Sequence, residues 1–176
     1  RATFDSFKMS WEQHAEFSSY SFYDQNNTEA PFTKLALEQV PIDWLNQLPG
    51  KTMVAAHASI IDSSTSSVST IKSISSFFSG NCVVGAEVTG GAARAFTDFR
   101  IHADGFSRFL ILDNQLKPGQ AGRLLQRLFE IEVYRVMALL AFPIAKQLTP
   151  ELNNANQQLL TITSAMAQAR ENDSDL

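Results

Sequence analysis

Residues 90–135 decide the fold, and they read GGAARAFTDFRIHADGFSRFLILDNQLKPGQAGRLLQRLFEIEVYR. Before Pro118, apolar and polar residues alternate, which predicts strands over Ala93–Ala103 and Phe106–Asp113. After Pro118, leucines recur every three or four residues, which is the spacing of a helix face. The change of period therefore indicates a sheet that is followed by helical structure.

The residues before this stretch extend the sheet towards the amino terminus. Alternation with aromatic enrichment predicts a hairpin of two strands, and the serine-rich stretch 62–80 has apolar residues at helical spacing, which favours a helix over a flexible linker. The predicted elements are strands over Phe7–Trp11, Phe17–Tyr23, Lys51–Ile61 and Cys82–Val88, a short helix over Ile42–Leu48 that Pro41 begins, and a helix within Ser66–Phe78. Strand, helix and strand from Lys51 to Val88 form a βαβ crossover between parallel strands.

Two prolines divide the helical part of the chain. Pro143 should interrupt the first helix, and Thr149 with Pro150 should begin a second one, as N-cap and first helical residue. The second helix has apolar residues near heptad spacing, which indicates a helical hairpin or the root of a coiled coil. The fold class is therefore α+β: a mixed, mainly antiparallel sheet over residues 1–117, with one βαβ crossover, and a helical hairpin over residues 118–176 that packs on it and continues beyond this chain.

A core is predicted where the sheet meets the first long helix. It consists of Trp11, Phe17, Phe99, Ile101, Phe109, Ile111, Leu124, Leu128 and Ile131. The hydrophobic fraction of 44% and the 13 phenylalanines are sufficient for such a core.

Composition and motifs exclude several classes of function. The net charge of −4 argues against nucleic-acid binding, because phosphate contacts need clustered lysine and arginine. The single cysteine, Cys82, has no partner for an internal disulfide. His14, His57 and His102 lie in three different elements without metal-ligand spacing, and no phosphate-binding or nucleophile motif is present. We therefore expect no metal and no cofactor.

Charged residues are concentrated between residues 94 and 135. Alternation places Asp98, Arg100 and His102 on one strand face, and the helix spacing pairs Arg127 with Glu130. The candidate polar network consists of Arg94, Asp98, Arg100, His102, Asp104, Arg123, Arg127, Glu130, Glu132 and Arg135. Three interpretations are open: a buried structural network, which we prefer, a ligand or catalytic pocket, or a solvated face.

Several segments together resemble a known protein family. They are SWEQHAEFSSYSFY, PIDWLNQLPG, VVGAEVTGGAARAFTDFRIHADGFSRFLILD and GQAGRLLQRLFEIEVYRVMALLAFPIAKQLTPEL. In these segments the chain resembles a family of bacterial proteins that are described as uncharacterised and membrane-anchored. The family is defined by a domain of unknown function. The resemblance implies a longer protein with coiled-coil-like helices and an apolar anchor near its carboxy terminus, so that this chain is a fragment. It implies no reaction, cofactor or site residue.

Two functions follow as alternatives. The preferred one is a non-enzymatic domain that works through assembly or partner binding, as a homo-oligomer held by the carboxy-terminal helices. The alternative is a ligand-binding or hydrolase-like enzyme that uses His102, Asp98, Asp104 and a helix arginine. We expect the whole protein to be membrane-anchored through a region absent from this chain, with the present part in the cytoplasm. The run Val133–Ala145 is shorter than the ~20 residues of a membrane-spanning helix.

Overall fold

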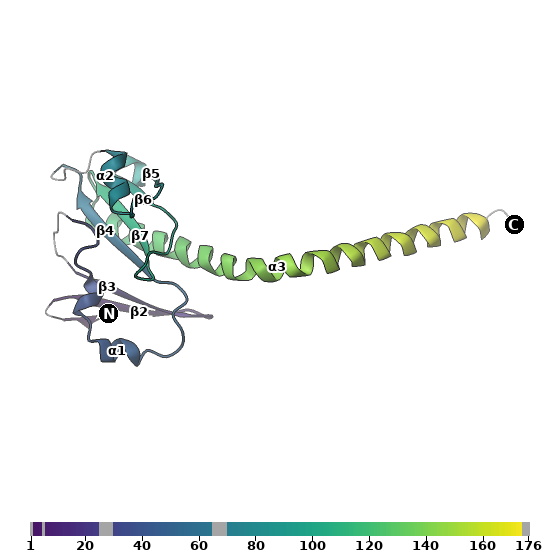
Figure 1. The fold of residues 1–176 in the computed structure, drawn as a ribbon, viewed down its shortest axis with the longest axis horizontal. Coiled ribbons are helices and arrows are strands. Elements are labelled where there is room, and N and C mark those ends of the chain that lie inside the picture. Colours follow the sequence, from purple (N-terminus) through teal and green to yellow (C-terminus); the bar gives the residue numbers. More distant parts are fainter. Residues whose placement is uncertain (1, 5, 25–29, 65–69, 174–176) are drawn as a thin grey trace. The chain divides into compact units, whose positions relative to one another are not determined.

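The chain forms two β-sheets and one long carboxy-terminal helix (Figure 1). The computed structural model describes residues 2–4, 6–24, 30–64 and 70–173, with side chains as far as residue 167. The α+β class is confirmed, although the strands form two sheets instead of one. The chain divides into two units, Arg1–Glu132 and Val133–Leu176. This boundary lies within the long helix, because its first turns pack on a sheet.

The first sheet has three antiparallel strands in the order β1-β2-β3, namely β1 (Ala2–Thr3), β2 (Lys8–Gln13) and β3 (Ser18–Tyr23). Its main part is the hairpin that the alternating aromatic residues predict. The short helix α1 (Ile42–Asn46) follows Pro41, as predicted. Its Trp44 meets Tyr20 and Phe22 of β3 edge-on, with ring centroids 6.1 Å apart in each pair. Edge-on aromatic contacts of this kind hold α1 against the sheet.

The second sheet has four strands in the order β4-β7-β6-β5. They are β4 (Ala56–Asp62), β5 (Val84–Val88), β6 (Ala93–Thr97) and β7 (Ser107–Asp113). The inner strand β7 is buried over residues 109–112, because side chains cover it on both faces. Short helix α2 (Ile71–Ser76) lies on one face, where Ile74 joins Ile61, Phe78, Leu110 and Leu112 in one core cluster. On the other face, Leu124 of the long helix packs with Ala93 and Ile111.

Helix α2 confirms the prediction of a helix in the serine-rich stretch. Thr70 is its N-cap: the Ser73 amide donates to the Thr70 hydroxyl at 3.3 Å, and the Thr70 amide donates to the Ser73 hydroxyl at 3.2 Å. This reciprocal pairing satisfies two amide groups that a helix start leaves unpaired. The expected beginning of the helix at residues 66–69 lies outside the described residues.

The two strands that the predicted βαβ crossover connects are not adjacent in the sheet. Strand β4 is parallel to β7, β7 is antiparallel to β6, and β6 is antiparallel to β5. Strands β4 and β5 therefore run in the same direction, as a βαβ unit requires, but they occupy opposite edges of the sheet.

The prediction of a strand over Ala93–Ala103 is wrong beyond Thr97. The Phe99 amide donates to the Thr97 hydroxyl and the Arg100 amide donates to Asp98 Oδ1, both at 3.2 Å, and Phe99 has a left-handed φ of 54°. Short polar side chains that bond nearby amides compete with strand pairing. As a result, Asp98 is buried, whereas Phe99 and Ile101 are exposed at 42% and 65% and do not belong to the core as predicted.

Among the other predicted core residues, Phe109, Ile111 and Leu124 are buried, and Phe17 and Leu128 are half-buried. The prediction is wrong for Trp11 and Ile131, which are about half exposed. Ile131 is exposed because the sheet-facing side of its helix carries Leu124, Leu128 and Glu132.

The helical hairpin is also wrong. One helix, α3 (Pro118–Asp173), contains both Pro143 and Pro150. It begins as predicted, with Pro118 in the first turn, and the Lys117 amide donates to Gln120 Oε1 at 3.0 Å. A proline removes its own amide hydrogen bond and crowds the carbonyl four residues before it. In an exposed helix that carbonyl can tilt outward and bond to water, so that the helix continues. The alternative of a coiled-coil root stays a prediction.

Candidate functional site

Asp98 and His102 form a closed pair in the loop between β6 and β7. His102 Nε2 lies 3.0 Å from Asp98 Oδ2, without the alignment of a hydrogen bond, and the two side chains are 4% and 0% exposed. Asn81 Nδ2 donates to the same carboxylate oxygen at 2.7 Å, and the Arg100 amide donates to the other. Both carboxylate oxygens are therefore engaged. Through Asn81, the pair connects the loop to the segment after α2. The two side chains of the pair are almost inaccessible to solvent.

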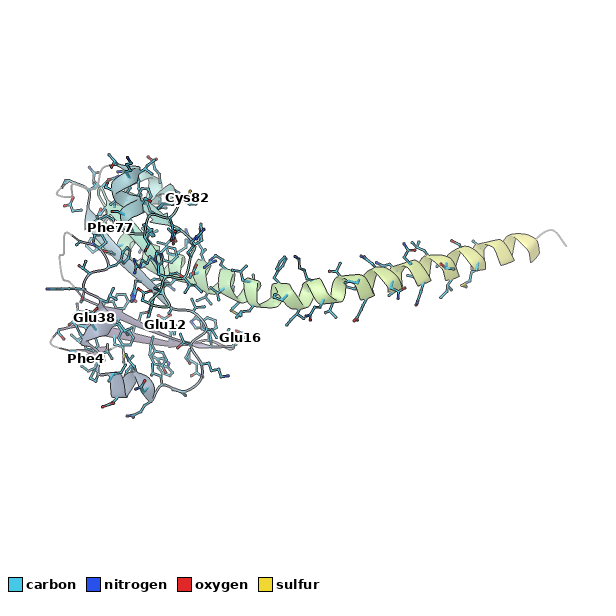
Figure 2. All side chains as sticks on the ribbon, viewed as in Figure 1. Phe4, Glu12, Glu16, Glu38, Phe77 and Cys82 are labelled. Atoms are coloured by element: carbon cyan, nitrogen blue, oxygen red, sulfur yellow. The ribbon has the colours of Figure 1, made fainter. Side chains whose placement is uncertain are left out.

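Arg108 of β7 connects the other end of the same loop. Its guanidinium donates to Asp104 Oδ2 and to the Phe77 carbonyl oxygen, both at 3.0 Å, and lies 5.3 Å above the Phe32 ring (Figure 2 labels Phe77). Burial raises the pKa of Asp104, but the hydrogen bonds from Arg108 and from the Phe106 amide outweigh it, so that the pKa lies below its ordinary value. Asp104 therefore pairs with Arg108, four residues further along the chain.

His57 of β4 lies next to Arg108 in the strand register. Its ring stacks on Phe106 at 4.0 Å with an interplanar angle of 10°. Nε2 is buried and has no hydrogen-bond partner among the described residues. Burial lowers the pKa of His57 and Arg108 lowers it further, while Asp104 and Glu38 oppose both. The pKa of His57 therefore lies below its ordinary value, which favours the neutral imidazole.

A second buried polar contact lies on the opposite face of the sheet. The Ser107 hydroxyl donates to Glu132 Oε1, and the two residues are 2% and 1% exposed. Beside them, the Phe109 and Phe129 rings meet edge-on at 6.3 Å. Ser107 was absent from the candidate network, because a serine at the start of an apolar strand gives no signal of its own.

The structure separates the remaining members of the candidate network. Arg94 is half-buried and lies 6.0 Å from the Phe96 ring centre. Glu130 is exposed and accepts a hydrogen bond from Gln126 at 3.0 Å. The other exposed members are Arg100, Arg123 and Arg127, and Arg135 is half-buried. The structure thus joins Asp98 with His102, and Asp104 with Arg108, but the ten residues do not converge on one site.

The chemistry available to these groups is limited by access. The described residues include no group of three or more His, Cys, Asp or Glu side chains placed to hold a metal ion. A shallow concavity of about 440 Å³ is lined by Gly90, Gly91, Ala92, Asn114, Gln115, Lys117 and Gln120, and so by neither His102 nor a helix arginine. An acid–base group must lie within hydrogen-bond reach of its substrate. The side chains of His102 and Asp98 are only 4% and 0% exposed, so a substrate hardly reaches them.

The second unit contains a different kind of candidate site. Between Val133 and Ala167, apolar residues follow an unbroken alternation of three and four positions, which we call the seam: Tyr134, Ala138, Ala141, Ala145, Leu148, Leu152, Ala155, Leu159, Ile162 and Met166. All ten are exposed. In the described part of the chain, no helix is long and apolar enough to cross a membrane.

The comparisons with known proteins give a family and no function. A family model described as "Protein of unknown function (DUF3422)" matches residues 1–176. No curated protein and no solved structure matches the chain. Because the family match spans the whole sequence, the chain belongs to this family of proteins of unknown function.

Proposed function

We propose that this chain is an assembly module, in which the helix Val133–Ala167 associates along its seam with the same helix of a second copy. The observation that carries the proposal is the exposure of all ten seam residues. Alternating three- and four-residue spacing is the pattern that two helices bury between them in a coiled coil. An apolar stripe of this length is rare on the surface of a monomer.

The size of the seam supports a second copy as its occupant. Six of the seam residues are large, and each of these six is at least 48% exposed. Each large side chain removes roughly 100 Å² of apolar surface from water when it is buried, so that two copies bury about 1,200 Å². Specific protein interfaces begin at about this size. The seam is therefore large enough for a stable pair of helices without any further partner.

Two matched variants test the proposal. Leu159 is in the seam, whereas its neighbour Leu160 is on another side of the helix and is equally exposed. Leu159→Asp should abolish association in analytical ultracentrifugation, because it places a charge between the helices. Leu160→Asp carries the same change in charge and helix propensity and should leave association intact. Equal behaviour of the two variants would contradict the proposal.

The proposal includes the setting of the longer protein, a bacterial membrane-anchored protein with this domain in the cytoplasm. The resemblance of the quoted segments supports this part. Membrane fractionation of the full-length protein, followed by protease treatment of intact and opened cells, tests it. Recovery in the soluble fraction, or cleavage of this domain in intact cells, would contradict it.

A hydrolase-like or ligand-binding site around His102, Asp98, Asp104 and a helix arginine has less support. The closure of the Asp98–His102 pair opposes it, since a substrate would have to open the loop first. In the assembly proposal His102→Gln should leave self-association unchanged, because His102 is not in the seam. A loss of association in this variant would contradict the assignment of association to the seam alone.

A further inference from the structure

We infer that the two helices run antiparallel, with the symmetry axis beside Pro150. This inference rests on the proposed self-association. It concerns the direction of the partner helix, which the proposed self-association leaves open. The distribution of large and small residues along the seam carries the inference, the positions of the two prolines are compatible with it, and a charge beside the seam offers a test.

Large and small residues are unevenly distributed along the seam. Three consecutive seam residues in its first half are alanine, at positions 138, 141 and 145, whereas its second half contains Leu159, Ile162 and Met166. In a parallel pair each seam residue faces the same residue of the partner, so that three alanine-only layers follow one another. The two helix axes would then be closer together over these alanines than over the large residues of the second half. Helix separation depends on the side chains at the contact. The helices of a parallel pair would therefore have to bend towards each other at the alanine layers.

An antiparallel pair removes this mismatch. When Leu152 faces Leu148 of the partner, Leu159 faces the partner's Ala141, and Ile162 faces the partner's Ala138. Large residues then meet small ones, and no two alanine-only layers are adjacent. Facing large and small side chains interdigitate at native packing density. The overlap runs from Tyr134 to Met166 in both copies, which is about 50 Å at 1.5 Å per residue.

The prolines are compatible with this arrangement. Pro143 and Pro150 are seven residues apart and are exposed. In the heptad defined by the seam, both occupy the position farthest from it. The carbonyl groups of Leu139 and Lys146, which lose their amide partners to the prolines, also lie on the side away from the seam and remain open to water. The prolines therefore leave the paired surface intact at its centre.

The charges beside the seam distinguish the two directions. Over residues 136–167, Glu151 is the one charged residue at a position that flanks the seam. In the antiparallel pair Glu151 approaches Glu151 of the partner near the axis, whereas in a parallel pair it faces the partner's Asn156. Glu151 is exposed in the single chain. The repulsion between the two copies of Glu151 is therefore small and is screened by salt. Glu151→Gln should therefore tighten an antiparallel pair several-fold at low salt and leave a parallel pair unchanged.

Distances between spin labels decide the direction. The exposed Cys82 is first replaced in Cys82→Ser, and Ser164→Cys then places one label on the outer side of α3. In an antiparallel pair the two labelled positions lie about 42 Å apart along the axis, from 28 residues at 1.5 Å each, and in a parallel pair they lie side by side. Asn153→Cys is the control, because its two copies lie within about 9 Å along the axis in the antiparallel pair and side by side in the parallel one.

Pulsed electron paramagnetic resonance should give a long distance for the label at 164 and a short one for the label at 153. A short distance at both positions would overturn the antiparallel direction while the proposed self-association stands. No intermolecular distance at either position, together with a monomeric mass, would overturn the proposed function as well. The effect of Glu151→Gln on the dissociation constant provides an independent reading on unlabelled protein.

Discussion

Replacing Glu132 with alanine tests the packing of α3 on the four-stranded sheet. The carboxylate is 1% exposed and accepts a hydrogen bond from Ser107, itself 2% exposed. Glu132→Ala leaves the buried Ser107 hydroxyl without this acceptor, which costs about 1–3 kcal/mol, and it removes a hydrogen bond that contributes about 0.5–1.5 kcal/mol. These two contributions overlap, so we expect a loss of roughly 2–4 kcal/mol in the free energy of unfolding.

The measurement is urea denaturation followed by circular dichroism, with Glu130→Ala as the control. Glu130 is two residues away on the same helix, is exposed, and accepts a hydrogen bond from Gln126, so its replacement should cost less than about 0.5 kcal/mol. At a slope of about 2 kcal/mol per molar urea, Glu132→Ala should lower the midpoint by roughly 1–2 M. If the two variants have the same midpoint, Glu132 is not buried and the packing described above is wrong.

Three further outcomes are expected. Because folding lowers the pKa of His57, the free energy of unfolding of the wild type should fall as the pH drops from about 7 to 5, through the ordinary histidine pKa. His57→Phe should reduce this dependence of stability on pH. An equal dependence in both proteins would refute the buried neutral imidazole. Gly85→Ala should cost roughly 1–3 kcal/mol, since its Cβ would lie 2.4 Å from the Phe96 ring, whereas Gly122→Ala meets no atom within 4 Å and should be neutral or stabilising, as thermal melts can show. Arg127→Ala should change the unfolding free energy by less than about 1 kcal/mol, because Arg127 is exposed; a larger loss in urea titration would restore the buried-network interpretation.

Local patterns in the sequence predicted most elements of the first unit. Alternation located β2, β3 and β7, and helical spacing located α2 despite its serine content. Alternation failed after Thr97, because the side chains of Thr97 and Asp98 bond to amides two residues ahead and end the strand. The Thr97–Asp98 pair is itself a turn signal. It was outweighed by the apolar residues Phe99 and Ile101.

The sequence was less informative about the candidate site. It named Asp98 and Glu132, but it did not name the partners that the structure supplies from distant segments: Asn81 for Asp98 and Ser107 for Glu132. Neither partner belongs to a periodic pattern, so no spacing rule could have paired them. The seam was visible in part, from Leu152 onwards, because the interpretation of Pro143 as a break hid its continuity with the first half of α3.

Sedimentation equilibrium of the unmodified chain tests self-association through the seam most directly. One copy has a mass of 19.5 kDa. Over a range of about 1 to 100 μM, the fitted mass should rise with concentration towards that of two copies, because association of two chains follows mass action. A mass of 19.5 kDa at every concentration would contradict the assembly proposal.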